Sequence, residues 1–296
     1  MPALSVIGSP TKRQTILELA TEADSRGFAG LAVPGAGGNL AMCTSLAHVT
    51  RTIPFWTSIQ PIYGAHPSDV ATSAGHIHEV SGGRFRLGLG VSHTNVLDRM
   101  GIAAGKPLTD TRNYVASLRA SVRGAEVLPP IWLAALRDNM FDLAVEVGDG
   151  AIWANASQSH TPLQVARIPA ERRASFSLSN MVPTVIDDDV DAARSVNRRT
   201  LASYLRWPNY RNYWRGAGFV EEMDAVEAAL ANNDRNGATA AMTDRWLDDC
   251  SISGGPTAVR DRLEMWHAMG VTPIAVMSST TGGQAKAIRQ LFDLYA

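Results

Sequence analysis

Eight short apolar segments, each followed by a stretch of helical pattern, constrain the fold of this 296-residue chain more than any other feature. Strands that alternate with helices predict a parallel sheet. Eight such units in about 300 residues fit a TIM barrel better than an open sheet. We therefore predict an α/β fold, a single (β/α)8 TIM-barrel domain over residues 1–296, with an extended helical seventh crossover. The predicted strands are residues 4–7, 30–33, 53–59, 84–91, 131–134, 151–154, 178–186 and 273–277.

Helices are predicted between these strands from apolar residues spaced three and four apart. Gly27 ends the first helix as a glycine after a helix C-terminus does, and Pro67 lies in the first turn of the third. The aromatic and basic segment 207–218 is predicted as a loop that covers the barrel mouth or forms a dimer contact. The predicted helices are residues 11–26, 40–49, 67–80, 111–122, 140–147, 190–205, 219–247, 257–269 and 284–295.

Charge and hydropathy argue against several classes of partner. The chain has 27 Lys and Arg against 28 Asp and Glu, so it has no excess of positive charge for nucleic acid or for an anionic membrane surface. No apolar run approaches the roughly 18 residues that a membrane span needs. Residues 1–5 show no basic or apolar part of a signal peptide, so we expect a cytoplasmic protein.

Neither the cysteines nor the histidines are spaced as metal ligands. Cys43 and Cys250 lie far apart, so we expect buried, reduced thiols. His76 and His78 lie in a helical pattern, where residues two apart do not share a face. We therefore predict no metal site.

The segment Gly88 to His93 follows a predicted strand and contains two glycines of a nucleotide-binding loop. His93 replaces the third glycine of Gly-x-Gly-x-x-Gly, and the pattern predicts no helix directly after it, so a Rossmann site is disfavoured. In a barrel, Ser92 and His93 instead follow the fourth strand, at the end where active sites of this fold lie. The chain has no Gly-x-Ser-x-Gly elbow and no phosphate loop, which suggests that a cofactor carries the chemistry.

Several ordered strings resemble the luciferase-like monooxygenase superfamily, and most closely its branch that uses the deazaflavin coenzyme F420. Two of them run from Thr57 to Tyr63 and from Ser81 to Gly90, the latter being Ser-Gly-Gly-Arg-Phe-Arg-Leu-Gly-Leu-Gly. The others are His66-Pro67, Ser92-His93 followed by Met100-Gly101, Pro130 to Leu136, and Ala144-x-Glu146-x-x-Asp149-Gly150.

The resemblance implies an oxidoreductase with a flavin-type ring at the C-terminal ends of the strands. In this family the ring rests against a bulge after strand three, often with a non-proline cis peptide, and Ser58-Ile59 matches that place. Ala134 to Leu136 resemble backbone donors on the phosphate side of the cofactor, and His93 is the candidate proton donor or ring contact. The residues that the resemblance assigns to the cofactor are Ser58, Ile59, Gly90, Ser92, His93, Ala134, Ala135, Leu136, Arg137, Trp153, Ala154 and Asn155.

The sequence also departs from the family. Arg137-Asp138-Asn139 stands where Gly-Pro-Arg is usual, so Arg137 would replace the phosphate partner while Asp138 repels an anion. Pro34 to Gly38 offers no side chain where many deazaflavin enzymes carry an Asp-His pair.

Three functions therefore remain open. The first is hydride transfer between reduced F420 and a small organic substrate. The second is an FMN-dependent monooxygenase, which would consume oxygen, and the third is a degenerate barrel that binds a cofactor without catalysis. Homodimers or higher homo-oligomers are usual in the superfamily, so we expect one here.

Overall fold

The computed structural model describes residues 1–35, 38–124 and 127–296. Strands and helices alternate along this part of the chain, and the parallel strand pairing is that of a (β/α)8 barrel, which confirms the predicted fold class. The chain divides into two compact units. Residues 2–153 and 168–179 form the N-terminal unit, and residue 1 with 154–167 and 180–296 forms the C-terminal unit. The single-domain organisation stays a prediction.

The strands of the N-terminal unit pair in chain order, all parallel. The predicted strand 53–59 ends early, because the chain leaves the sheet after Thr57 and a short strand then pairs with Leu89 and Gly90. In order, the strands are β1 (Ala3–Ser5), β2 (Gly30–Val33), β3 (Phe55–Thr57), β4 (Gln60–Pro61), β5 (Phe85–Gly90), β6 (Ile131–Ala134) and β7 (Gly150–Ala154), whose last residue belongs to the C-terminal unit.

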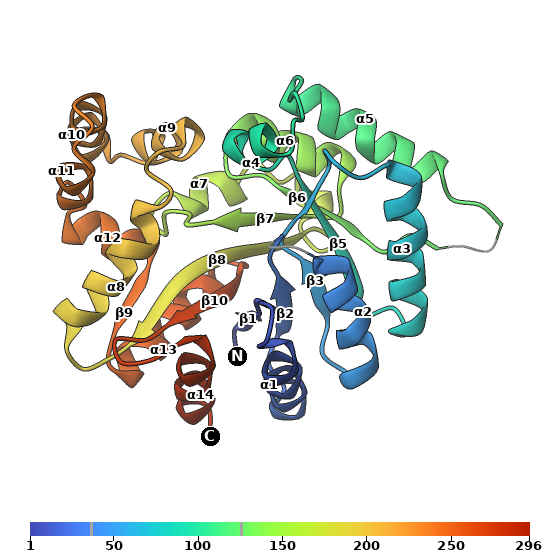
Figure 1. The fold of residues 1–296 in the computed structure, drawn as a ribbon, viewed down its shortest axis with the longest axis horizontal. Coiled ribbons are helices and arrows are strands. Elements are labelled where there is room, and N and C mark those ends of the chain that lie inside the picture. Colours follow the sequence, from blue (N-terminus) through green and yellow to red (C-terminus); the bar gives the residue numbers. More distant parts are fainter. Residues whose placement is uncertain (36–37, 125–126) are drawn as a thin grey trace. The chain divides into compact units, whose positions relative to one another are not determined.

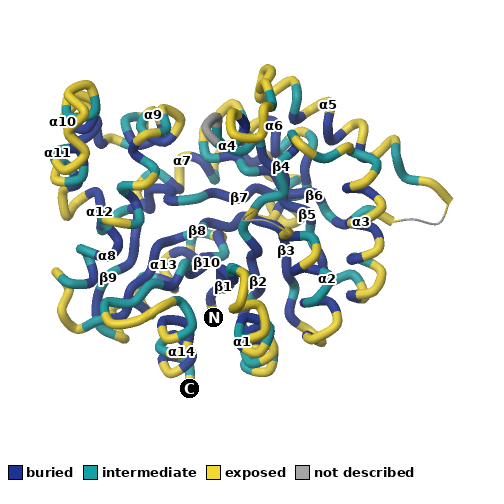
Figure 2. The backbone as a smooth tube through the Cα atoms, in the orientation of Figure 1, coloured by how far each residue is buried: buried dark blue, intermediate teal, exposed yellow. Residues whose placement is uncertain are grey.

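Five longer helices cover the outer face of these strands, each packed on the next (Figure 1). Their inner faces are buried and their outer faces exposed (Figure 2). Gly27 ends the first with a φ of 78°, and Pro67 and Pro107 stand in first turns. They are α1 (Arg13–Arg26), α2 (Asn39–Val49), α3 (Pro67–Val80), α5 (Pro107–Ala120) and α6 (Asp138–Val147).

One helix of this unit contradicts the sequence analysis. The short helix α4 (Thr94–Arg99) begins directly after His93, where no helix was predicted. One of the two reasons given against a Rossmann site, the lack of a helix after His93, is therefore wrong. The conclusion still holds, because the strand pairing is that of a barrel. The remaining element of the unit is a 3₁₀ turn, η1 (Ala170–Arg172).

The C-terminal unit holds the extended helical seventh crossover that was predicted. β8 (Ser177–Ile186) pairs with β9 (Ile252–Gly254) and with β10 (Thr272–Ser278). Between β8 and β10 come β9 and the helices α8 (Val190–Ala202), α9 (Pro208–Gly216), α10 (Val220–Ala231), α11 (Arg235–Ala240), α12 (Asp244–Cys250) and α13 (Pro256–Ala268). The unit also contains α7 (Thr161–Val165) and α14 (Gln284–Leu294).

The predicted aromatic loop 207–218 is wrong, because most of it forms α9. Tyr210, Tyr213 and Trp214 are buried, and Trp214 packs on Trp246 with ring centroids 4.8 Å apart. These three rings belong to the core of the C-terminal unit, whereas Trp207 is half-buried.

The two cysteines are free and buried, as predicted. Among the described residues, no helix is both long enough and apolar enough to cross a membrane.

Candidate functional site

The chain makes a sharp irregularity directly after β3. Thr57 holds the strand to β5, because its Oγ1 donates to the Gly88 carbonyl at 2.8 Å and accepts from the Gly88 N–H at 2.9 Å. The next peptide bond, Ser58-Ile59, is cis, at the place where the resemblance implies one. Asn39 Nδ2 donates to the Ile59 carbonyl at 3.2 Å, so α2 also fixes this turn.

Ile59, Gly90 and Ala134 lie against one another at the C-terminal ends of the strands and form an apolar wall. A Cβ atom on Gly90 would lie 2.8 Å from Ile59 Cγ1 and 3.0 Å from the Ala134 Cβ. Glycine is therefore required for Ile59 to lie across the end of β5. Ser58 Oγ, in the same turn, is buried and has no hydrogen-bond partner in the part of the chain that the structure describes. A buried hydroxyl without a partner is unfavourable unless a ligand or water satisfies it.

Ser92 and His93 connect β5 to α4. Ser92 has a φ of 64°, a left-handed conformation that few residues other than glycine and asparagine adopt. His93 is half-buried, and its carbonyl accepts the N–H groups of Val96 at 2.9 Å and Leu97 at 3.1 Å. The backbone of His93 thus begins the helix.

The segment after β6 only partly matches its implied role. The Ala135 N–H donates to the Ile152 carbonyl at 3.1 Å, so it belongs to the sheet and is not the phosphate donor that the resemblance implies. Arg137 is exposed at the N-cap of α6, and its carbonyl accepts from the Phe141 N–H at 2.9 Å. Asp138 follows it at the first helical position and is also exposed. The first N–H groups of a helix have no partner within the helix, so this end favours an anion.

The residues at the end of β7 have different surroundings. The Trp153 ring is fully buried and packs on Phe141 of α6, with centroids 5.5 Å apart, so it faces the helix layer. Ala154 is half-buried. Asn155 is buried in the C-terminal unit with a φ of 58°, its N–H donates to the Met181 carbonyl at 2.9 Å, and its carbonyl accepts from Trp214 Nε1 at 3.1 Å.

The structure thus brings Ile59, Gly90 and Ala134 into direct contact beside Ser58, within the N-terminal unit. Sequence reasoning missed Asn39, which holds the Ile59 carbonyl. The only signal was a polar residue at the start of a predicted helix, and that is equally typical of a helix cap. Nearby, a Cβ on Gly35 would lie 2.6 Å from the Ile59 carbonyl oxygen. Residues 36 and 37 of the side-chain-free segment lie outside the described residues.

The arginine of the Ser-Gly-Gly-Arg string is structural. Arg84 donates five hydrogen bonds: Nε to the Ser81 carbonyl, Nη1 to Thr50 Oγ1 and the Ile53 carbonyl, and Nη2 to the Ala47 and Thr50 carbonyls, over 2.7–3.1 Å. These acceptors include carbonyls at the C-terminal end of α2, which a helix leaves without partners. The string therefore joins α2 to β5 and positions the strand that carries Gly90.

The histidine pair lies in a helix, as predicted. His78 Nδ1 lies 3.2 Å from the Phe85 carbonyl, and His76 is exposed. In the described ranges, no three His, Cys, Asp or Glu side chains are grouped as a metal site would require.

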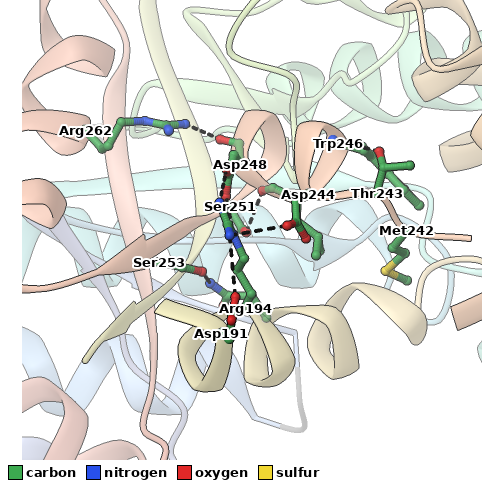
Figure 3. Close-up of polar contacts among 12 residues, drawn as sticks. Asp191, Arg194, Met242, Thr243, Asp244, Trp246, Asp248, Ser251, Ser253 and Arg262 are labelled. Atoms are coloured by element: carbon green, nitrogen blue, oxygen red, sulfur yellow. Dashed lines mark hydrogen bonds and ion pairs between the residues drawn. The ribbon is translucent and has the colours of Figure 1, made fainter. Parts of the chain in front are cut away.

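A second polar cluster lies in the C-terminal unit around Arg194 of α8 (Figure 3). Its Nη2 lies 2.6 Å from Asp248 Oδ2, and its Nη1 lies 3.3 Å from Asp244 Oδ2. The hydrogen bond that Arg194 donates to Asp248 raises the pKa of Arg194. Because one arginine holds two carboxylates and joins α8 to α12, we interpret this cluster as a structural support of the crossover.

The sequence model of the luciferase-like monooxygenase family matches residues 4–273. The chain is 29% identical over 278 residues, 84% of each protein, to the 5,10-methylenetetrahydromethanopterin reductase of Archaeoglobus fulgidus.

Two solved structures share the fold. The coenzyme F420-dependent tetrahydromethanopterin reductase of Methanopyrus kandleri has a TM-score of 0.76 at 19% identity, over 98% of this chain and 96% of that one. The oxygenating constituent of the 3,6-diketocamphane monooxygenase of Pseudomonas putida, solved with FMN, has a TM-score of 0.64 at 14% identity, over 100% and 96%. Because the family match covers nearly the whole barrel, this chain belongs to the luciferase-like monooxygenase family.

Proposed function

We propose that this protein is an F420-dependent oxidoreductase that transfers a hydride between the deazaflavin and a small organic substrate. The observation that carries the proposal is the wall of Ile59, Gly90 and Ala134, with the buried Ser58 hydroxyl in the same turn. An apolar wall without a Cβ atom at Gly90 leaves the backbone open to close approach by a planar ring. A hydroxyl without a partner is suited to a polar edge of that ring.

The residues after β6 support the charged end of such a cofactor. Arg137 stands exposed at the N-terminus of the ten-residue helix α6, where a cation and the positive end of the helix dipole both favour a phosphate. Asp138 opposes them by like-charge repulsion, so we expect a phosphate to be held less tightly here than by an arginine alone. The residues fit the cofactor on the ring side and, with this one penalty, on the anionic side.

When bound, the deazaflavin supplies the hydride at its C5 position. The protein would supply position and exclusion of water. The Thr57–Gly88 hydrogen bonds and the Asn39–Ile59 contact hold the wall in place. The left-handed backbone of Ser92 sets the direction in which the chain continues to His93. We assign His93 as the group that contacts the ring or donates a proton to the substrate, because it follows the strand that carries Gly90.

The relatives rank F420 ahead of FMN. The curated relative reduces a methanopterin derivative by name, and the neighbour that is F420-dependent by name has the higher TM-score of the two described. The FMN-bound neighbour keeps an FMN-dependent monooxygenase as the alternative.

A binding titration tests the proposal. F420 or FMN is added to the purified protein while cofactor fluorescence and melting temperature are followed. We expect saturable binding of F420 and a rise in melting temperature, with no oxygen consumption by the reduced complex. Binding of FMN alone, with oxygen uptake after reduction, would reverse the ranking. If neither binds below about 1 mM, weaker than about −4 kcal/mol, the cofactor assignment is wrong.

A variant tests the role of His93 separately. With an identified substrate, His93→Ala should lower turnover by about 100-fold, the usual contribution of a general acid. Unchanged turnover would remove His93 from the chemistry while leaving cofactor binding intact.

A further inference from the structure

A pocket of about 690 Å³ opens at the N-terminal ends of β5, β6 and β7. Its wall includes Arg86 near the start of β5, Trp132 near the start of β6 and Asp149 just before β7. All its lining residues belong to the N-terminal unit. The proposed cofactor residues lie at the opposite, carboxyl ends of the same strands, so this Arg86 pocket is a separate site.

The guanidinium of Arg86 presents one complete edge to the pocket. Its Nη1 donates to the Gly83 carbonyl at 2.7 Å and to the Phe85 carbonyl at 3.0 Å. Its Nε and Nη2 have no hydrogen-bond partner among the residues that the structure describes, and both atoms are accessible to solvent. Two parallel N–H donors on one edge are the arrangement that binds a carboxylate or a phosphate through two hydrogen bonds.

The charge around this edge is unbalanced. Arg86 is half-buried, and no described carboxylate lies within ion-pair distance of it. Burial lowers the pKa of Arg86, and no neighbouring carboxylate offsets this effect. A desolvated cation without a counter-ion is unfavourable, and a bound anion would remove that cost.

The other charged side chains of the wall, Arg119 and Asp149, offset one another, so the wall keeps one net positive charge. Arg119 adds a second cation, which donates through Nη2 to the Val147 carbonyl at 2.7 Å. The single acid of the lining, Asp149, is engaged, since its Oδ2 accepts the Ile131 N–H at 2.8 Å. His78 contacts the Phe85 carbonyl. The pocket therefore favours an anion.

The remaining wall determines the kind of anion. Leu128, Pro129, Pro130 and Trp132 line the pocket with apolar surface beside Ser175 and Ser177, and a bare inorganic ion would leave that apolar surface uncovered. We propose that the Arg86 pocket binds a small carboxylic acid with a flat apolar body. Its carboxylate pairs with Nε and Nη2 of Arg86, and its body lies against Trp132 and the two prolines. The site does not depend on the proposed function, because neither its residues nor its ligand take part in that chemistry.

Calorimetric titration of the wild-type protein tests the proposal with three probes. Benzoate carries the carboxylate and the flat body, benzamide is its neutral counterpart, and inorganic phosphate is an oxyanion without a body. We expect benzoate to bind saturably, at least about tenfold more tightly than either of the others, and with the same affinity when F420 is saturating. The proposal would be overturned if benzamide bound as tightly as benzoate, or if F420 competed with benzoate. It would also be overturned if benzoate did not saturate the protein by 20 mM, which corresponds to a binding free energy of roughly −2 kcal/mol. Tighter binding of phosphate would overturn the carboxylate assignment.

A pair of variants locates the binding. Arg86→Gln removes the charge and the two-donor edge, so it should weaken benzoate binding by about tenfold or more. Arg26→Gln is the matched control, because Arg26 lies on α1, is paired with Glu22 and does not line the pocket. Unchanged affinity in Arg86→Gln would contradict the proposal. If Arg86→Gln does not fold, Arg119→Gln must still weaken benzoate binding. The comparison of benzoate with benzamide on the wild-type protein then decides whether the pocket recognises a carboxylate.

Discussion

Single residues determine whether the candidate site can accept a ring, and Gly90 is the most sensitive of them. Gly90→Ala would place a methyl group 2.8 Å from Ile59 Cγ1 and force that side chain off the wall. We expect about 1–3 kcal/mol of destabilisation from overpacking and F420 binding weakened by about tenfold or more. Urea unfolding and fluorescence titration measure the two effects.

Gly216→Ala provides the control for this change. A Cβ atom there meets nothing within 4 Å, so stability should change by no more than about 0.5 kcal/mol and F420 binding should not change. F420 binding by Gly90→Ala at wild-type affinity would show that the ring does not rest on this wall.

We expect two neighbouring side chains with opposite charges, Arg137 and Asp138, to affect the anionic end of the proposed cofactor. Arg137→Gln should weaken F420 binding by about five- to tenfold, and Asp138→Asn should strengthen it by about two- to fivefold, because both residues are exposed and screened. Both changes should shrink at 0.5 M salt. A weaker complex in Asp138→Asn would mean that Asp138 assists binding, as a helix cap or through its own contacts.

At the scale of elements, sequence pattern predicted the strands and most of the helices because their apolar periodicity follows from burial. It failed where tertiary contacts set the boundary. The strand predicted over 53–59 ends at Thr57, because the Thr57–Gly88 bonds and the turn at Ser58 redirect the chain. Tyr210, Tyr213 and Trp214 are spaced three and four residues apart, which is typical of a helix such as α9. A segment rich in aromatic and basic residues is also typical of a surface loop, and the loop was predicted.

The candidate site was predictable only through resemblance. Periodicity places Gly90 at a strand end, yet it does not show that Ile59 and Ala134 converge on it from two other strands. The occupied N–H of Ala135 and the contribution of Asn39 depend on strand register and helix placement, which no local pattern encodes.

The charged cluster of the seventh crossover makes a prediction for its elements. Arg194→Met leaves Asp244 and Asp248 without their shared cation, so unfolding free energy should fall by about 1–3 kcal/mol, with the side chain already partly solvated. Arg198→Met, one turn along α8, loses one ion pair at 3.3 Å and should cost less than about 1 kcal/mol. Urea unfolding compares them, and equal losses would show that the cluster adds nothing beyond a surface pair.

At the scale of the whole molecule, the near-neutral charge of −1 provides no general attraction for an anionic cofactor. We therefore expect local groups such as Arg137 to hold the phosphate of F420 or FMN. Formation of a homo-oligomer stays a prediction, which sedimentation velocity can test.

The two thiols report on the integrity of the whole fold. Burial raises the pKa of Cys43 and of Cys250 well above the ordinary value for a thiol, so neither reacts readily as a thiolate. In native buffer at pH 8, a disulfide reagent should modify them at least about a hundredfold more slowly than in urea, because reaction requires opening of the structure. Fast labelling of one thiol in the native protein would mean that its unit opens locally.

Two tryptophans of the N-terminal unit pack against each other near the Arg86 pocket. Trp56 of β3 and Trp132 of β6 lie with ring centroids 5.1 Å apart. Trp132 lines the Arg86 pocket, whereas Ala134, two residues or about 7 Å further along the strand, contacts the wall beside Gly90. A ligand in the Arg86 pocket would therefore lie beside this indole pair, and quenching of its fluorescence would report occupancy of the pocket apart from events at the Gly90 end.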